Sequence, residues 1–249
     1  MIATTESGLQ VCSFFHILCS MKRSTILILV IALFTTCKNN SKTEDQVDKV
    51  ITDSIQNAKR EADSLLKIKI IQDSILAENR KDSILLKLTQ NILISLKNKN
   101  YRAFSNYIHP VQGIRFSPYG HIDTIKHVKF SKASFLSQAN KDEQDMIIWG
   151  SFDGTGDPIR MTLNNYLQRF VYDVDFAKAE NLKVNEFIGN GNSINNLLSV
   201  YKDCDFTESH FSGFEEKYAG MDWKSLRLVF KQRNGRYLLV GIVHDEWTI

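Results

Sequence analysis

The chain lacks glycine and proline between Lys38 and His109, although both occur regularly from Pro110 onward. A stretch this long without either helix breaker is typical of continuous helix. Cysteine and proline are scarce throughout, with 4 and 3 copies, which excludes a disulfide-rich scaffold. A formal net charge of only +3 gives no support to nucleic acid as a partner.

An apolar run long enough to cross a membrane is also missing near the N-terminus. The run at residues 26 to 34 has nine residues, and as a helix it rises only about 14 Å, whereas a bilayer core needs about 20 residues. Lys22 and Arg23 precede this run and small residues follow it. That order is typical of a secretory signal peptide, and we expect it to occupy residues 1 to 36, with Met21 as the true start.

The signal ends in Phe34-Thr35-Thr36-Cys37, which resembles a bacterial lipobox. In such a box the cysteine sulfur receives diacylglycerol, and the new N-terminus is acylated after cleavage. Phe34 and Thr36 depart from the commoner Leu and Gly, Ala or Ser. The resemblance implies a lipoprotein attached to a membrane through Cys37, because two or more acyl chains give stable attachment. The alternatives are an uncleaved signal anchor and a free secreted protein.

The residue after the lipobox indicates which membrane holds the protein. Lys38 rather than Asp follows Cys37, which favours the outer membrane of a Gram-negative cell envelope. After cleavage and lipidation, Cys204 is the remaining free thiol, so neither a disulfide nor a zinc site of paired cysteines can form within one chain. We expect Cys204 to be a small buried residue.

A lipidated tether at residues 37 to 44 is expected to lead into a helical stalk at residues 45 to 98, roughly 80 Å long if fully helical. Asp-Ser followed by Ile or Leu recurs from residues 53, 63, 73 and 82. A short coiled-coil seam alternates steps of four and three through Ile51, Ile55, Ala58, Ala62 and Leu65. The pattern leaves open a solitary spacer helix, self-association through a coiled coil, and a helix lying on a membrane surface.

Residues 99 to 249 are predicted to form one α+β domain, in which helices pack on a curved antiparallel sheet preceded by the stalk. Thr162 is a candidate cap for a helix at 163 to 171, and Ser193 for a helix at 194 to 201. Strands are expected at residues 145 to 152, 205 to 211, 225 to 232 and 236 to 245. The last two are joined by Asn234-Gly235, a strong hairpin signal.

Several long motifs in this region resemble a group of bacterial secreted proteins and lipoproteins. They are IHPVQGIRFSPYGHID at 108 to 123, WGSFDGTGDPIRMT at 149 to 162, FVYDVDF at 170 to 176, GMDWKSLRLVF at 220 to 230 and VGIVHDEWTI at 240 to 249. The resemblance implies no established activity or cofactor. The order of helix first and sheet later is also similar to NTF2-like and cystatin-like domains, by architecture alone.

The aromatic side chains of the domain are dense enough to line a cavity between a helix and a curved sheet. We expect a ligand site, for a small ligand or an envelope partner, with no cofactor and no catalysis. The predicted ligand-binding residues near its mouth are Tyr119, His121, Trp149, Arg227 and His244.

Two other kinds of chemistry are alternatives to simple binding. Asp153 and Asp157 on a Gly-rich loop are candidate calcium ligands, but the loop lacks the EF-hand pattern and is expected to be a turn with Asp side chains bonded to backbone amides. The rival function is a secreted hydrolase using His244 or His210 with Asp153 or Asp157. Adjacent residues of a strand face opposite sides, so such a pair has to form across elements rather than with Asp245.

Overall fold

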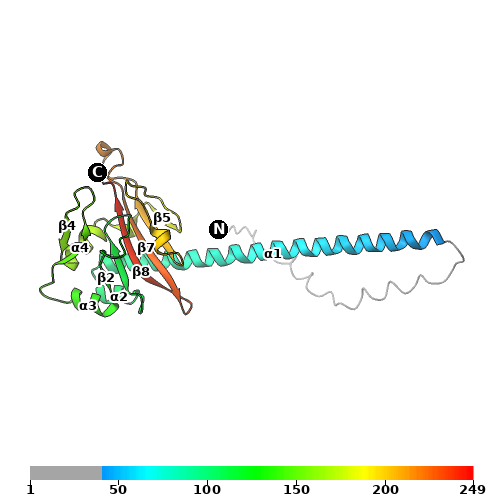
Figure 1. Cartoon of the computed structure of the whole chain (residues 1–249), viewed down its shortest axis with the longest axis horizontal. Coiled ribbons are helices and arrows are strands. Elements are labelled where there is room, and N and C mark those ends of the chain that lie inside the picture. The colour runs from blue at the N-terminus through cyan, green and yellow to red at the C-terminus, as the bar shows by residue number, and fades with distance from the viewer. Residues whose placement is uncertain (1–40, 249) are drawn as a thin grey trace, which may run out of the picture. The chain divides into compact units, whose positions relative to one another are not determined.

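The computed structural model describes residues 41 to 248, and their side chains from Asp48 onward (Figure 1). The predicted signal peptide and Cys37 lie outside the described residues. The chain divides into two units, one ending at Lys67 and the other beginning at Ile68. Within residues 41 to 248, no helix combines the length and apolar character that a membrane crossing requires.

The first described element is helix α1, Ser41–Lys97, which belongs to both units. In the first unit, the seam residues Ile51, Ile55 and Leu65 are all more than half exposed. The Ser54 hydroxyl donates to the carbonyl of Val50, so the serine of this Asp-Ser motif is bonded within its own helix. The seam therefore has no partner within the described part of this unit.

The C-terminal part of α1 belongs to the folded second unit. Leu85, Ile92, Leu93 and Leu96 are buried in the main core, and the hydroxyls of Thr89 and Thr207 lie 2.7 Å apart inside it. The compact unit therefore begins well before residue 99, where the sequence suggested a boundary.

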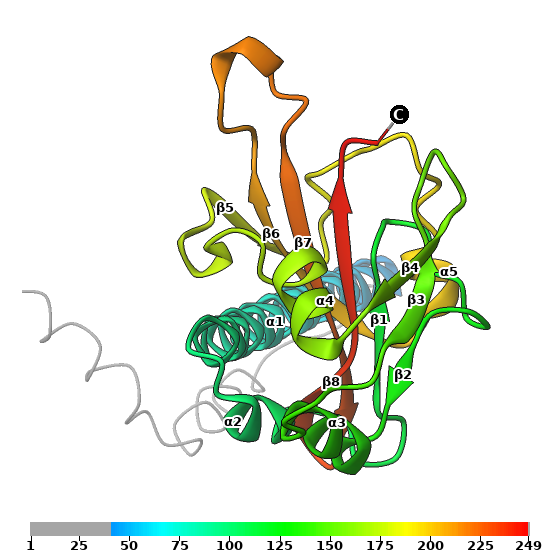
Figure 2. The ribbon, with the colours of Figure 1, turned by 90° about the vertical axis from the view of Figure 1, so that its left-hand side faces the viewer.

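A mixed sheet of six strands forms the centre of the second unit, in the order β2-β1-β8-β7-β6-β5 (Figure 2). The strands are β1 Ile114–Ser117, β2 Lys129–Phe130, β5 Asn181–Val184, β6 Asp205–Phe211, β7 Lys224–Arg233 and β8 Arg236–Glu246. The predicted α+β class with a helical stalk is confirmed. The sheet is not purely antiparallel, because β1 pairs in parallel with β8; the long connection between them permits this.

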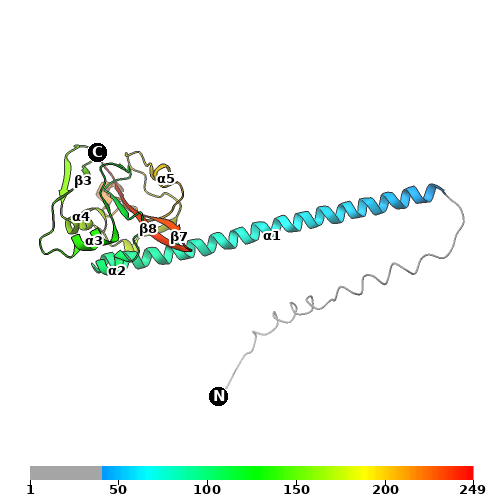
Figure 3. The same ribbon diagram turned by 60° about the horizontal axis from the view of Figure 1, so that its bottom comes forward.

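The two faces of this sheet have different coverings. The end of α1 and α4, Leu163–Phe170, pack on one face, where the main core includes Leu226, Leu228 and Ile242. Helix α5, Leu197–Val200, covers the other face, where a smaller core contains Phe206, Val229 and Val243 (Figure 3). The central strands are therefore buried on both faces.

Several short elements complete the unit. The helices α2, Tyr101–Ser105, and α3, Lys132–Ala139, pack against each other at one end, and β3, Ile147–Ser151, pairs with β4, Pro158–Met161, in a separate two-stranded sheet. The remaining elements are the 3-10 turns η1, Phe176–Lys178, and η2, Glu216–Tyr218.

Local sequence signals have mixed outcomes. Thr162 caps α4 through the amide of Asn165, and Asn234 and Gly235 both have positive φ, as a hairpin turn of this kind requires. The expected cap at Ser193 is wrong. The Ser193 hydroxyl donates to Asp153 instead, and α5 begins only after Asn196.

Candidate functional site

Trp149, one of the predicted ligand-binding residues, is a core residue. Its side chain is fully buried and its ring stacks on Tyr166 with centroids 3.8 Å apart. The indole N–H donates to the carbonyl of Met161 at 2.9 Å. Its polar group and one ring face are thus engaged within the core.

Arg227 lies on the opposite face of the sheet in a buried ion cluster. Its Nε donates to Glu208 Oε2 at 2.9 Å and its Nη1 to Asp245 Oδ2 at 2.8 Å. The Arg227 and Glu208 side chains are both fully buried. Burial raises the pKa of Asp245, although Arg227 opposes this shift.

The same guanidinium holds the loop at residues 185 to 196 against the sheet. Arg227 Nη2 donates to the Gly189 carbonyl at 2.8 Å, while the Gly189 amide donates to Glu208 Oε1 at 2.8 Å. A Cβ on Gly189 would lie 2.4 Å from the Ser225 hydroxyl, so the loop needs glycine at this contact. This cluster is structural, and it leaves Arg227 no free group for a ligand.

Of the other three predicted residues, Tyr119 belongs to the same core as Trp149, and Tyr119 and His244 both pack against Phe170. The Tyr119 ring packs edge-on against Phe170, His121 is exposed, and His244 is fully buried beneath α4. None of the five predicted residues lines either of two cavities found in the described part of the chain, which are described below.

The Gly-rich loop is a turn in which the Gly154 amide donates to Asp153 Oδ1 at 3.2 Å, as the sequence suggested, whereas the Asp157 side chain accepts no amide among the described residues. Asp153 Oδ2 accepts from the hydroxyls of Ser193 and Thr248 at 2.7 and 2.6 Å, and these two bonds lower the Asp153 pKa. Asp157 is exposed, and its amide donates to the Thr155 hydroxyl. Neither aspartate belongs to a metal-capable cluster within the described residues.

The side chains next to His210 and His244 are not the aspartates that the hydrolase alternative requires. His210 Nδ1 lies 2.8 Å from the Ser225 hydroxyl, which donates to Glu208. This serine is fully buried, so the arrangement is part of the Arg227 cluster. His244 faces Asp173, from the turn after α4, at 3.4 Å between Nε2 and Oδ2.

A cluster of opposite charges surrounds His244 on the α4 face. Lys224 donates to Asp173 and to Glu246 Oε2, while Arg169 donates to Glu246 Oε1 at 2.5 Å. Burial raises the pKa of Asp173, but His244 and Lys224 outweigh it, and the pKa falls to about 2. The sequence signal that leads here is the alternation in β8, which places His244 and Glu246 on one face.

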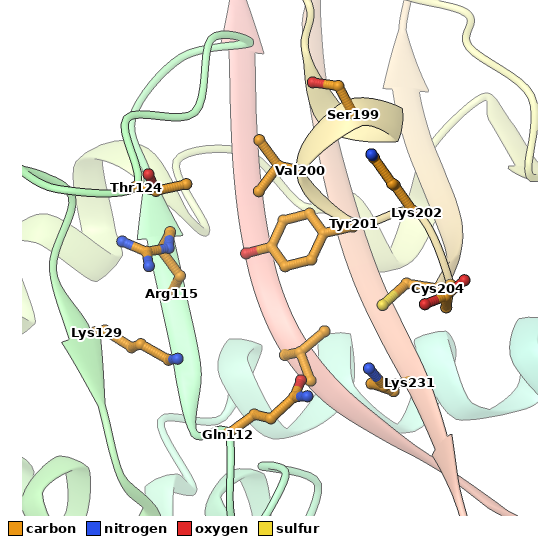
Figure 4. Close-up of a pocket in the computed structure, with 12 residues that line it drawn as sticks. Gln112, Arg115, Thr124, Lys129, Ser199, Val200, Tyr201, Lys202, Cys204 and Lys231 are labelled. Carbon is orange, nitrogen blue, oxygen red and sulfur yellow. The ribbon is translucent and has the colours of Figure 1, made fainter.

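A cleft of about 550 Å³ lies on the other face of the sheet, between β1 and the segment after α5. Figure 4 shows the Tyr201 ring lying over β8, between Arg115 on one side and Cys204 on the other. Gly241 makes room for this ring, because a Cβ there would lie 2.6 Å from the Tyr201 hydroxyl. Burial raises the pKa of Cys204, which keeps the thiol protonated and unreactive.

The cleft is lined by an excess of positive charge. Its cations are Arg115, Lys129, Lys202 and Lys231, and its one acidic side chain is Asp203. None of these cations forms an ion pair with a carboxylate in the described part of the chain. Arg115 is fixed in place, because its Nη1 donates to the His127 carbonyl at 2.9 Å.

The positive charge of the cleft helps to lower the pKa of two nearby histidines, His109 and His127. Burial lowers the pKa of His109, and Arg233, Lys231 and Lys129 lower it further. Its Nδ1 accepts the amides of Val111 and Gln112, which requires a neutral form of the ring. Burial likewise lowers the pKa of His127 to about 4, with a smaller contribution from Arg115.

The second cavity, of about 600 Å³, lies between α1 and the tip of the β7–β8 hairpin. Its lining mixes Leu76, Ile84 and Tyr237 with Asp73 and Arg80. It has no excess of one charge comparable to that of the cleft.

Sequence reasoning missed the cleft because its cations come from distant segments. Arg115 is on β1, Lys202 follows α5 and Lys231 is on β7. The sequence did predict that Lys231 lies on the polar face of a strand. That Arg115 lies on the same face follows only from the parallel register of β1 with β8, which the sequence does not reveal.

Comparison with protein families, curated proteins and solved structures finds no match for this chain. The resemblance to bacterial secreted proteins and lipoproteins therefore stays a prediction.

Replacing Arg227 by Met is expected to lower the free energy of unfolding by about 3 to 5 kcal/mol, because Glu208 and Asp245 would be left without their buried partner. The matched control is Arg160→Met on an exposed strand position, with an expected change within about 0.5 kcal/mol. Urea unfolding measures both. Similar small losses in the two variants would contradict the structural role of Arg227.

Acidification is expected to destabilise the folded protein through His127. Its Nδ1 accepts the Asp123 amide at 3.1 Å, so protonation breaks this bond. An unfolded chain takes up the proton near pH 6.5 and the folded one only near 4. Stability present above pH 6.5 is therefore lost as the pH falls towards 4, by about 1 to 2 kcal/mol after solvent screening.

The measurement is the free energy of urea unfolding between pH 7.5 and 4.5 for the wild type and the His127→Gln variant. The difference between the two proteins should shrink as the pH falls. His121→Gln, at an exposed histidine, should keep the pH dependence of the wild type. A constant offset between wild type and His127→Gln would refute the assignment.

Proposed function

We propose that this chain is a lipid-anchored protein of the cell envelope whose C-terminal domain binds an anionic ligand in the cleft beside Tyr201. The observation that carries the proposal is the convergence of Arg115, Lys129, Lys202 and Lys231 on one cavity without carboxylate partners among the described residues. Isolated surface cations are common, but a concave site focuses their field and raises the local concentration of anions.

The nature of the cations indicates the ligand class. Arg115 uses one nitrogen to bond the His127 carbonyl, which orients the guanidinium while other N–H groups stay available. A guanidinium held in this way suits a planar or tetrahedral oxyanion such as carboxylate, phosphate or sulfate. Lysines add charge with less directional demand. We therefore expect a small ligand that carries an oxyanion, with phosphate and sulfate as the first groups to test.

The size of the cleft supports a ligand larger than a single inorganic ion. A volume of about 550 Å³ falls within the usual range for small-molecule sites, about 300 to 1,000 Å³. The Tyr201 ring and Val240 provide apolar surface beside the charges. A sugar or another compact scaffold carrying the anionic group would use both kinds of surface.

The placement of the domain rests on the N-terminal motif. Lys22 and Arg23, the short apolar run and Cys37 support export followed by lipidation. The outer membrane of a Gram-negative bacterium is the proposed location. The exposed apolar residues of α1, including Ile51, Ile55 and Leu65, favour self-association of this segment as a coiled coil.

The cleft is tested by titrating the purified protein with pyrophosphate and with a sulfated disaccharide by calorimetry. Arg115→Gln and Lys231→Gln should each weaken binding about tenfold, because a hydrogen bond to a charged group contributes about 1.5 to 3 kcal/mol. Arg160→Gln and Lys178→Gln, at exposed positions outside the cleft, are the matched controls. Absence of binding, or equal losses in all four variants, would reject the proposal.

The anchor is tested by labelling growing cells with radioactive palmitate. The wild-type protein should take up the label and sediment with membranes, and Cys37→Ser should lose both properties, because serine has no sulfur to acylate. Cys204→Ser is the matched control and should behave as wild type. Label that persists in the Cys37→Ser protein would refute lipidation at this residue.

A further inference from the structure

The charged cluster around His244 lies away from the proposed ligand cleft. His244 and Glu246 come from β8, Lys224 from β7 and Asp173 from the turn that follows α4. His244 pairs with Leu226 in the sheet register, and Leu226 belongs to the main core beneath the helices. The cleft is on the opposite face, so an inference about this cluster does not depend on the proposed function.

His244 has the hydrogen-bond arrangement of a metal ligand. Its Nδ1 lies 3.2 Å from the carbonyl oxygen of Pro118, and because a carbonyl only accepts, Nδ1 carries the hydrogen. The side chain is fully buried, and Nε2 faces Asp173 Oδ2 at 3.4 Å without forming a hydrogen bond of good geometry to it or to any other described group. Histidines that bind metals usually donate their other ring N–H to a carbonyl or carboxylate in this way, which fixes the free nitrogen on the metal.

Two carboxylates face this free nitrogen. One ligand atom from each of Asp173, His244 and Glu246 can be chosen so that all lie within 4.8 Å of one another. Asp173 Oδ1 is itself buried without a hydrogen-bond partner. His244 Nε2 and Asp173 Oδ2 are 3.4 Å apart, which matches the separation of about 3.3 to 3.4 Å between ligands of a tetrahedral zinc ion with bonds of about 2.0 to 2.1 Å.

We infer that Asp173, His244 and Glu246 form a binding site for a divalent transition metal of the zinc class. An imidazole ligand in a small set of donors suits zinc, whereas calcium and magnesium prefer oxygen donors in greater number. Three protein ligands leave a fourth position of the tetrahedron for water. Arg169 donates to Glu246 from outside the set and orients that carboxylate.

Lys224 is the competitor for this site. Its ammonium group contacts both carboxylates, so it supplies the positive charge when no metal is bound. About a fifth of its side chain is exposed, at 22%, and its long stem allows the ammonium to withdraw towards water. Zinc binding therefore displaces Lys224 from at least one carboxylate, and removal of the lysine should strengthen the site.

The experiment measures zinc bound to the purified chain by elemental analysis after desalting, and affinity by competition with a chromophoric chelator. The wild type should hold about one zinc per chain, and His244→Gln and Asp173→Asn should each bind at least about tenfold more weakly. Lys224→Met should bind more tightly than wild type. His121→Gln and Asp157→Asn, which make the same chemical changes at exposed positions, should match the wild type.

Cobalt gives a second readout, because a tetrahedral cobalt site with an imidazole ligand absorbs visible light. The band should be present in wild type and absent from His244→Gln, with circular dichroism confirming that the metal-free variant is folded. If His244→Gln does not fold, the comparison uses Asp173→Asn. A wild-type chain that retains no zinc, or zinc retained equally by the ligand variants and their controls, would overturn the site.

Discussion

The folded unit depends on a guanidinium that has been removed from water. Arg227 is fully buried between Glu208 and Asp245, and its last donor bonds the Gly189 carbonyl. Desolvating these charges is costly unless every one is paired, so the loop at residues 185 to 196 has to close over them. That loop continues into α5 and then into the residues that form one wall of the cleft. The Arg227 cluster therefore helps to position one wall of the cleft, although it does not line the cleft itself.

Alternate side chains of β7 and β8 point to opposite faces of the sheet, so each face carries its own cluster of charged residues. Residues pointing towards α4 include His244 and Glu246, whereas Asp245 points to the Arg227 cluster on the other face. Neighbours in the sequence thus belong to environments that do not touch. Because the sheet lies between them, the charged groups around His244 and those around Arg227 cannot exchange hydrogen-bond partners.

The parts of the fold that could be predicted are those with local periodicity. The strand at residues 205 to 211, the Asn234-Gly235 hairpin and the α4 cap at Thr162 all agree with the structure. The short strands β1, β2, β4 and β5 escaped notice, because two to four residues leave too few positions for an alternating pattern. The cap at Ser193 failed because Asp153, distant in sequence, recruits that hydroxyl.

Residue type alone was a poor guide to the site. Trp149 and Arg227 are residues that binding sites often use, but here an aromatic stack and two carboxylates occupy them. The cations of the cleft drew no attention individually. They come together because β1 pairs in parallel with β8. This pairing links segments far apart in the chain, so a local sequence pattern cannot predict it.

That register also governs the order in which the domain can assemble. Arg115 pairs with Gly241 on the last strand, so this part of the sheet cannot close before the C-terminal hairpin has been synthesised. Until then Phe116 and its neighbours lack their strand partner, and apolar edges stay exposed to other chains. Pairing of β1 with the final strand therefore removes an exposed sheet edge that other chains could otherwise pair with.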